Sequence, residues 1–269
     1  MSAAPALSLS HVTCTFAPRG PVRPAYTAVD NVTLSVADGE FLALVGPTGC
    51  GKSTLLNVAA GLIAPTSGDV QVFGEPLRGR NARAGYLFQG DALFPWRNAL
   101  DNVAIGLEFR GVARGEARER ALSWLRQVGL AAHAAKYPHE MSGGMRKRVA
   151  LAQSWVLEPR ILLMDEPFSA LDVQTRQLME NALLELWVQA RRSVLFVTHD
   201  LDEAIALADR VVVLSAGPAS HPVAQFAIDL PRPRDVQEIA SHPRFIELHR
   251  AVWQALKAEV LRAREQADA

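Results

Sequence analysis

The sequence predicts an α/β fold in which helices cover a mainly parallel β-sheet. From residue 161 to 214, apolar strand-like segments alternate with helix-like segments, and this alternation implies right-handed crossovers between parallel strands. The expected strands are 161–164, 194–198 and 211–214, and the expected helices between them are 173–190 and 202–208. Earlier in the chain, the apolar run 41–45 leads at once into a glycine-rich turn and a helix-like segment at 52–62, which adds a further strand and helix.

Other elements surround this core. Residues 7–13 and 32–36 alternate apolar and polar side chains as half-exposed antiparallel strands do, and the prolines and glycine within 18–24 predict a loop between them. Apolar residues at helical spacing within 90–155 predict a helical insert. The remaining expected elements are strands at 70–73 and 85–88 and helices at 117–128, 142–156 and 243–262. We therefore expect one domain over 1–215 and a C-terminal tail, 216–269, with an amphipathic helix.

Composition excludes several classes of protein. The chain has 269 residues, 49% of them hydrophobic, and 28 Lys+Arg balance 28 Asp+Glu. These values are those of a folded globular protein, and the neutral net charge argues against general nucleic-acid binding. Only two cysteines are present, and neither a secretory signal nor a membrane-spanning apolar run is evident, so we expect the chain to stay in the cytosol.

A phosphate-binding loop is predicted between the strand 41–45 and the helix that follows it. Residues 46–53 fit the pattern of Gly, four residues and Gly-Lys-Ser, in which backbone N–H groups and a helix N-terminus face an anion. Lys52 is expected to reach the β- and γ-phosphates, and the Ser53 hydroxyl to ligate Mg²⁺. The predicted ATP-binding residues are Gly46, Pro47, Thr48, Gly49, Cys50, Gly51, Lys52, Ser53 and Thr54.

Two carboxyl groups follow the apolar strand 161–164. Asp165 and Glu166 are thereby placed at the carboxyl edge of a parallel sheet, where ligands of open α/β folds bind. We expect Asp165 to hold Mg²⁺ or its water, and Glu166 to polarise the attacking water.

Residues 141–148 (Met-Ser-Gly-Gly-Met-Arg-Lys-Arg) resemble the signature motif of ATP-binding cassette (ABC) ATPases, usually written LSGGQ. Physically this is a helix N-terminus with two glycines, a second anion cradle in a chain whose P-loop already provides one. The resemblance implies a head-to-tail homodimer, in which the signature of one chain completes the ATP site of the other. The expected contacts to the partner's ATP are Ser142, Gly143, Gly144 and Met145. Met141 and Met145 stand where the family usually has Leu and Gln. We interpret these two differences as adjusting the motif without loss of its function.

The resemblance implies further site residues and a fold. Gln89 resembles the Q-loop glutamine that touches Mg²⁺ and the attacking water, and His199 resembles the switch histidine at the γ-phosphate. Residues 169–172 resemble the D-loop of the dimer seam, with Ser169 and Asp172 as its contacts. The implied catalytic residues are Glu166, His199 and Gln89, and the implied magnesium ligands are Ser53, Gln89 and Asp165. The implied fold is that of P-loop NTPases: a RecA-like, mainly parallel sheet with an antiparallel β subdomain and a helical insert.

Two alternatives stay open near the P-loop. Phe16 is the best match for the aromatic that stacks on adenine, and Tyr26 is its rival because the intervening loop makes the alignment ambiguous. Cys50, beside Lys52 and a helix N-terminus, is either an activated thiol or an unreactive one.

Finer features resemble the ATPases of nitrate, sulfonate and taurine importers. Pro95-Trp96 lies shortly after the Q-loop, and residues 230–234 read Leu-Pro-Arg-Pro-Arg. This implies a subunit peripheral on the inner face of the cell membrane, with transmembrane permease subunits as partners and, indirectly, an extracytoplasmic solute-binding protein. The permease contact is expected in a groove between sheet and insert near 89–96, where Phe94 and Trp96 either bind the partner or pack in the core.

Three functions are compatible with these motifs. The leading one is the energy-coupling ATPase of a bacterial importer for a small solute. A soluble ABC ATPase of translation or DNA repair would typically fuse two cassettes or carry coiled-coil or basic insertions, which this sequence lacks. A nucleotide-gated binding module without turnover is disfavoured by the presence of both Glu166 and His199.

Overall fold

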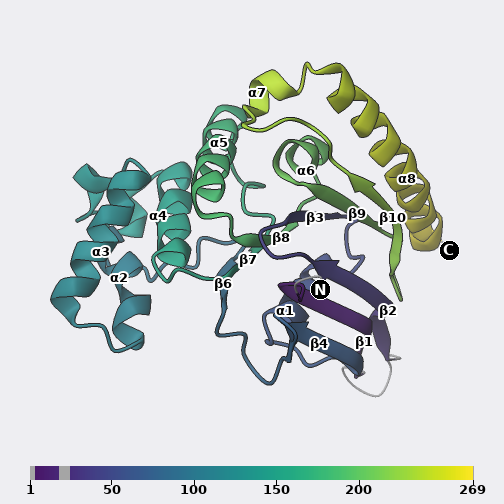
Figure 1. Ribbon diagram of the computed structural model, residues 1–269, viewed down its shortest axis with the longest axis horizontal. Coiled ribbons are helices and arrows are strands. Elements are labelled where there is room, and N and C mark those ends of the chain that lie inside the picture. The colour runs from purple at the N-terminus through teal and green to yellow at the C-terminus, as the bar shows by residue number, and fades with distance from the viewer. Residues whose placement is uncertain (1–3, 18–24, 269) are drawn as a thin grey trace.

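A computed structural model describes residues 4–17 and 25–268 of the protein. In this part of the chain, two β-sheets are surrounded by helices (Figure 1). The strands are β1 (Leu7–Phe16), β2 (Tyr26–Val36), β3 (Phe41–Val45), β4 (Ser67–Val72), β5 (Glu75–Pro76), β6 (Ala84–Leu87), β7 (Ile161–Asp165), β8 (Ser193–Val197), β9 (Arg210–Leu214) and β10 (Pro222–Ala227). The helices are α1 (Lys52–Ala59), α2 (Ala99–Phe109), α3 (Arg114–Gln127), α4 (Gly143–Trp155), α5 (Val173–Ala190), α6 (Leu201–Leu207), α7 (Val236–Ile239) and α8 (Pro243–Asp268). The loop predicted at 18–24 lies outside the described residues.

The larger sheet is mainly parallel. Its strand order is β10-β9-β3-β8-β7-β6, and only β10 pairs antiparallel with its neighbour. All five residues of β3 are buried, as the continuous apolar run predicted. The predicted α/β fold is confirmed. Because the carboxyl ends of parallel strands meet at one edge, the residues after β3, β7 and β8 come together there.

The smaller sheet is antiparallel, with the strand order β2-β1-β4-β5. Helix α1 packs between the two sheets: Leu55 and Leu56 share one buried cluster with Leu42 and Leu44 of β3 and Leu9 of β1. This packing fixes the start of α1 at the carboxyl end of β3, where the glycine-rich turn lies.

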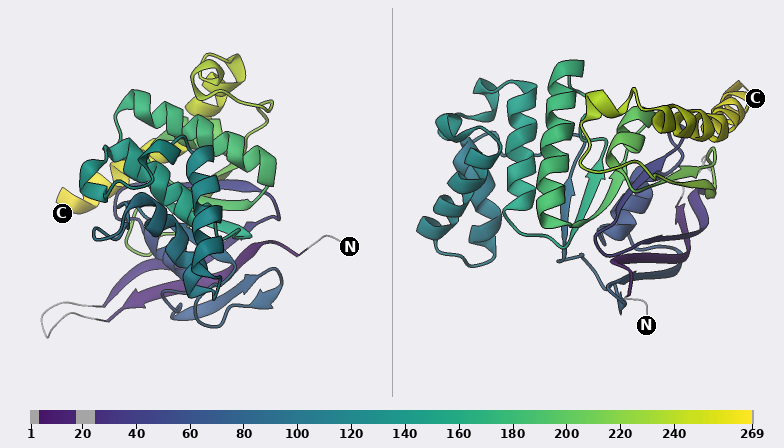
Figure 2. Two further views of the ribbon diagram at one scale, coloured as in Figure 1. Left: turned by 90° about the vertical axis from the view of Figure 1, so that its left-hand side faces the viewer. Right: turned by 45° about the horizontal axis from the view of Figure 1, so that its top comes forward.

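The helical insert stands to one side of the sheets and consists of α2, α3 and α4 (Figure 2). It has a buried cluster of its own, in which Val103 of α2 and Leu125 of α3 meet Val149 of α4. Helices α3 and α4 lie within two or three residues of the predicted ranges. Helix α2 was not predicted; Asn98 caps it by accepting a hydrogen bond from the Asp101 N–H.

The C-terminal residues continue the main body of the protein. Strand β10, which was not predicted, adds an antiparallel edge to the larger sheet, and α8 packs against α6, β9 and β10. Phe245, Leu248, Val252 and Leu256 of α8 are buried in the same cluster as the parallel strands. In the part of the chain that the structure describes, no helix is both long and apolar enough to cross a membrane.

Candidate active site

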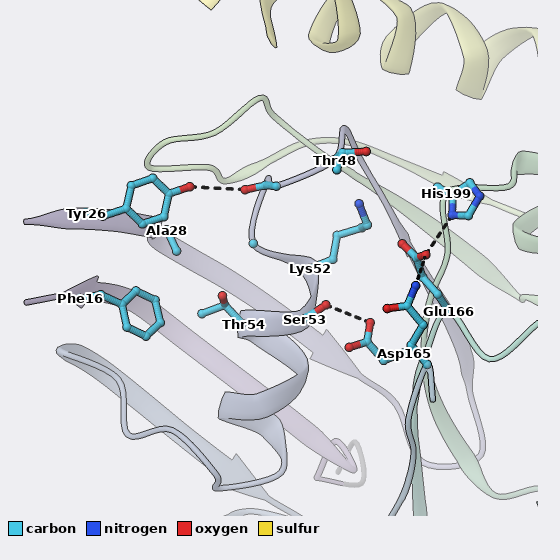
Figure 3. A pocket seen from close by; sticks show the side chains of 13 residues that line it. Phe16, Tyr26, Ala28, Thr48, Lys52, Ser53, Thr54, Asp165, Glu166 and His199 are labelled. Atoms are coloured by element: carbon cyan, nitrogen blue, oxygen red, sulfur yellow. Dashed lines mark hydrogen bonds and ion pairs between the residues drawn. The ribbon is translucent and has the colours of Figure 1, made fainter. Parts of the chain in front are cut away.

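A pocket of about 530 Å³ opens at the carboxyl edge of the larger sheet, beside the start of α1 (Figure 3). It brings together segments far apart in sequence: the strands β1 and β2, the P-loop, and the ends of β6, β7 and β8. Its lining residues are Phe16, Tyr26, Ala28, Thr48, Gly49, Gly51, Lys52, Ser53, Thr54, Gln89, Asp165, Glu166 and His199. Ten of the residues predicted from the sequence therefore meet around one cavity. Phe16 and Tyr26, the two candidates for stacking on adenine, and Ala28 complete its lining.

The turn from β3 to α1 requires glycine. Gly49 and Gly51 have φ of +79° and +90°, a region that L side chains rarely adopt. At Gly46 a Cβ atom would lie 2.7 Å from Cys50 Sγ and 3.1 Å from Leu214 Cβ, so no side chain fits. The glycines predicted to present backbone N–H groups to an anion are thus needed for the loop to fold.

Lys52 supplies the positive charge of the loop. Only 6% of the residue is exposed, and its Nζ atom donates hydrogen bonds to the carbonyls of Gly46 (2.8 Å) and Pro47 (3.0 Å). In Figure 3, Lys52 lies between the aromatic pair and the acidic pair of the pocket. The first turn of α1 carries no acidic residue, so the helix N-terminus adds its partial positive charge to that of Lys52. The loop is suited to bind phosphate.

Ser53 and Asp165 form an oxygen-rich corner of the pocket. The Ser53 hydroxyl donates to Asp165 Oδ1 at 3.0 Å. Burial raises the pKa of Asp165 and the Ser53 hydrogen bond opposes that rise, so a cation beside this carboxylate would be stabilising. A hydroxyl and a carboxylate are ligands that Mg²⁺ accepts, and Mg²⁺ commonly takes one or two protein ligands together with phosphate oxygens. Among the described residues, no cluster of three or more His, Cys, Asp or Glu side chains could hold a metal ion.

Three predicted catalytic residues converge on one oxygen atom. Glu166 Oε2 lies 3.1 Å from His199 Nδ1 and accepts a hydrogen bond of 3.5 Å from Gln89 Nε2. Glu166 has a φ of +43°, which is uncommon for a residue with a side chain and is a form of strain found at functional sites. Its backbone N–H donates to the carbonyl of Val197, which ties the end of β7 to β8. The arrangement places an amide and an imidazole directly against the carboxylate that is expected to position water.

The two candidate adenine-stacking residues lie side by side. Phe16 and Tyr26 are paired across β1 and β2, both line the pocket, and 40% and 47% of their surfaces are exposed. The Tyr26 hydroxyl donates to the carbonyl of Gly49 at 3.4 Å. Stacking on adenine by Phe16 stays a prediction, with Tyr26 as the alternative.

Cys50 belongs to the P-loop but does not line the pocket. It is fully buried, and burial raises the pKa of its thiol although Lys52 opposes the rise. Of the two alternatives, the structure favours the unreactive thiol. Cys50 and Cys14 are both free, as expected of two cysteines that form no disulfide framework.

The signature and D-loop residues adjoin each other outside the lining of the pocket. Ser142 caps α4 by accepting a hydrogen bond from the Met145 N–H at 3.3 Å, and Gly143 begins the helix. At Gly144 a Cβ atom would lie 2.5 Å from Thr175 Cγ2, so glycine permits the close approach of α4 to α5. In the D-loop, Asp172 caps α5 by accepting from the Thr175 N–H, and Ser169 donates to the Glu166 carbonyl at 3.0 Å. Among the described residues, none of 142–145 or 169–172 lines the pocket.

Comparison with known proteins assigns the family. A family model described as ABC transporter matches residues 29–169. The chain is 45% identical to an uncharacterized ABC transporter ATP-binding protein of Methanocaldococcus jannaschii, over 88% of this chain and 86% of that protein. It is 44% identical to the taurine import ATP-binding protein TauB of Burkholderia pseudomallei (88% and 92% covered) and 41% identical to the nitrate import ATP-binding protein NrtD of Synechococcus elongatus (86% and 84%).

The chain belongs to the ABC transporter family. A solved structure of an ATP-binding cassette, a dimeric post-hydrolysis state bound to ADP and phosphate, superposes with a TM-score of 0.73 at 30% identity and covers 84% of this chain and all of that one. The resemblance drawn from the signature motif is therefore confirmed, as is the fold of a P-loop NTPase. This ABC cassette binds and hydrolyses ATP.

Sequence reasoning missed several residues that shape the cassette's site. Ala28 lines the pocket, Lys147 donates to the carbonyl of Gln89, and Ser220 donates to the carbonyl of Cys50. Ala28 and Ser220 belong to no local motif and reach the site through tertiary packing. For Lys147 a signal was available: it lies within 141–148, the segment that resembles the signature motif, on the buried face of α4.

Proposed function

We propose that this ABC cassette is the energy-coupling subunit of an importer for a small solute such as nitrate, a sulfonate or taurine. The observation that carries the proposal is the similarity, at 41–44% identity over most of both chains, to relatives named for taurine and nitrate import. The segment after Gln89, with Pro95-Trp96, supports the same subfamily. The proposed cassette comprises residues 1–215, with a helical insert at 90–155, and residues 216–269 form a C-terminal segment whose strand β10 extends the larger sheet.

Phosphate binding is assigned to the P-loop. Lys52 and the backbone N–H groups of the loop attract the β- and γ-phosphates, which are negatively charged and need donors in a fixed direction. Mg²⁺, when bound beside Ser53, Asp165 and Gln89, would neutralise charge that develops on the phosphate oxygens. The aromatic side chain of Phe16 offers a face on which adenine stacks.

Hydrolysis is assigned to the residues around Glu166. Its carboxylate accepts a hydrogen bond from water and directs the oxygen toward the γ-phosphate, and Gln89 holds the carboxylate from one side. His199, whose Nδ1 lies 3.1 Å from the same carboxylate, is assigned to contact the transferred phosphoryl group. The chemistry depends on alignment and charge, with little covalent work for the protein.

We assign the complete site to a homodimer. Ser142 and the N–H groups of Gly143 and Gly144 form an anion cradle on the insert, distant from the pocket of their own chain. The dimeric cassette structure that this chain resembles supports an arrangement in which the signature faces the partner's ATP. Ser169 and Asp172 would then lie along the seam. Turnover would depend on closure of the dimer.

A permease helix is the proposed occupant of a groove between β6 and the insert. The groove has a volume of about 250 Å³, and its apolar lining includes Phe88, Phe94 and Phe109, of which Phe109 is 79% exposed. Trp96 beside it is 70% exposed and contacts Phe94, with ring centroids 5.4 Å apart. Exposed aromatic side chains around an apolar groove are typical of a docking site. The subunit would lie peripherally on the inner face of the membrane.

The two alternative functions make different predictions about the groove and about Glu166. A soluble ABC ATPase that serves another process has no need of a membrane partner in the groove, and a binding module without turnover needs no Glu166. We therefore test the proposal with one variant at Glu166 and one beside the groove.

The first experiment uses Glu166→Gln. This substitution keeps the shape of the side chain and removes its charge, so ATP still binds, turnover falls by about a hundredfold or more, and the dimer persists in ATP. Size-exclusion chromatography in ATP and in ADP measures the dimer, and phosphate release measures turnover. A protein that stays monomeric in ATP contradicts the composite site.

The second experiment isolates the coupled complex. The subunit is purified with its membrane partner, placed in liposomes with a solute-binding protein, and assayed for ATP hydrolysis with and without nitrate, an alkyl sulfonate or taurine. Stimulation by one solute supports import, and hydrolysis that ignores every solute and needs no membrane subunit supports the soluble alternative. Trp96→Ala should weaken association with the membrane subunit, while the matched control Trp253→Ala, an exposed tryptophan on α8, should not.

A further inference from the structure

The C-terminal helix reaches the back of the P-loop through hydrogen bonds that begin at Glu259. Only 4% of Glu259 is exposed. Its Oε2 atom accepts a hydrogen bond of 3.0 Å from the backbone N–H of Ala216, and its Oε1 atom pairs with Arg262 at 2.6 Å. A carboxylate this deeply buried is costly without such partners. Glu259 therefore attaches α8 to Ala216, the start of the turn that joins β9 to β10.

This turn lies directly against the P-loop. Ser220 is fully buried, and its hydroxyl donates a hydrogen bond to the carbonyl of Cys50, while its backbone N–H donates to the carbonyl of Ala28 at 3.2 Å. At Gly217, a Cβ atom would lie 3.2 Å from the Gly49 carbonyl oxygen, so the turn and the loop are in close contact. The turn thus links α8, strand β2 and the P-loop.

The Ser220 hydrogen bond acts on a peptide group of the phosphate-binding loop. In a planar trans peptide the C=O and N–H groups point to opposite sides. With the Cys50 carbonyl held by Ser220, the N–H of Gly51 is directed away from the turn, and Gly51 lines the pocket. Phosphate binding by such a loop requires N–H groups held in a fixed direction.

We propose that Ser220 and Glu259 are positioning residues, through which the C-terminal segment preorganises the P-loop for the phosphates of ATP. The inference rests on the assignment of the P-loop as the nucleotide site. A peptide fixed before binding loses less conformational freedom when the ligand arrives. The two residues therefore strengthen nucleotide affinity and have little effect on the rate at saturating ATP.

The test compares four single variants of the full-length protein. Ser220→Ala removes the hydrogen bond to the Cys50 carbonyl, and Glu259→Ala removes the acceptor of the Ala216 N–H together with the partner of Arg262. Glu259→Gln keeps an acceptor oxygen for the Ala216 N–H, and Glu247→Ala removes an exposed glutamate of α8 that pairs with Arg244. We expect Ser220→Ala and Glu259→Ala to raise the Kd for a fluorescent ATP analogue roughly three- to tenfold, from the loss of one hydrogen bond. The KM for ATP should rise equally and kcat should change less than twofold. Glu259→Gln and Glu247→Ala should bind within about twofold of the natural protein.

A purely structural role gives a different result. It lowers the thermal unfolding midpoint of Ser220→Ala and Glu259→Ala without changing Kd at a temperature where all variants are folded, and that outcome overturns the proposal. So does Glu259→Gln binding as weakly as Glu259→Ala. Lys52→Ala serves as the reference for the nucleotide site. If Lys52→Ala binds the analogue as tightly as the natural protein does, the P-loop assignment fails. If Lys52→Ala loses affinity while the Kd of Ser220→Ala is unchanged, only the positioning role is rejected.

Discussion

The buried carboxyl group of Glu180 should make the stability of the cassette depend on pH. Glu180 lies on α5 with 2% of its surface exposed, and burial, together with the carboxylates of Glu203 and Asp200, raises its pKa from 4.5 to about 8, although Arg176 opposes the rise. Between these two values the unfolded chain is ionised and the folded chain keeps its proton. The free energy of unfolding therefore falls as pH rises from about 4.5 to about 8, and levels off above that.

The magnitude follows from the two pKa values. One pKa unit corresponds to about 1.4 kcal/mol, so ionisation of Glu180 lowers the free energy of unfolding by roughly 4 kcal/mol at pH 8. Glutamine has a similar shape and no charge at any pH. The difference in free energy of unfolding between Glu180→Gln and the natural protein should therefore increase by about 3–4 kcal/mol, in favour of the variant, from pH 5 to pH 8. A constant offset introduced by the amide does not affect this increase.

Urea unfolding followed by tryptophan fluorescence measures this difference at pH 5, 6, 7 and 8. The matched control is Glu185→Gln, an exposed glutamate of the same helix, whose difference from the natural protein should stay constant over the range. A Glu180→Gln difference that is also constant with pH would refute burial as the cause. Burial also raises the pKa of Glu203, to about 7, so the natural protein should lose further stability over the same range.

Three other substitutions or reactions test the site. Lys52→Ala should weaken binding of a fluorescent ATP analogue about tenfold or more, because it removes a charge-assisted contact to phosphate; unchanged affinity in an equilibrium titration contradicts the P-loop assignment. Gly144→Ala should lower the free energy of unfolding by about 1–3 kcal/mol, because its Cβ atom would clash with Thr175, and Thr175→Ser should restore part of the loss in urea unfolding. Cys50 should react with maleimide only when the protein is unfolded, and mass spectrometry that finds it modified in the folded state contradicts its burial.

Elements with strong local signals could be predicted closely from the sequence. The strand at 41–45 and the helix at 173–190 have the predicted ends, because a continuous apolar run and the Asp172 cap mark them locally. Helix α2 was missed because Asn102, a polar residue, stands at a fully buried position and donates to the carbonyls of Phe94 and Arg97. Such a tertiary role interrupts the apolar periodicity on which the prediction depends.

Strand β10 was missed for a different reason. Its residues alternate only between half-buried and exposed, and what covers its inner face is α8, which follows later in the chain. An edge strand covered by a distant helix has no strong local pattern. The same limit applies to the site: Lys52 and Glu166 line the pocket and stand in local motifs, whereas Ala28 lines it from β2 without one. Ser220 contacts the P-loop only because the turn after β9 packs on β2.

The insert and the proposed catalytic carboxylate of Glu166 are connected by hydrogen bonds within one chain. On the first turn of α4, Lys147 donates to the carbonyl of Gln89, and Arg146 donates to Asp91 at 2.7 Å. Burial lowers the pKa of Lys147 and Asp91 opposes the change, so the ammonium is held where the Q-loop supplies both a carbonyl and a carboxylate. The side chain of Gln89 in turn donates to Glu166. Because a shift of α4 must move or break the contacts around Gln89, displacement of the insert by the partner proposed for the adjacent groove would have a direct route to Glu166, the residue proposed to position water.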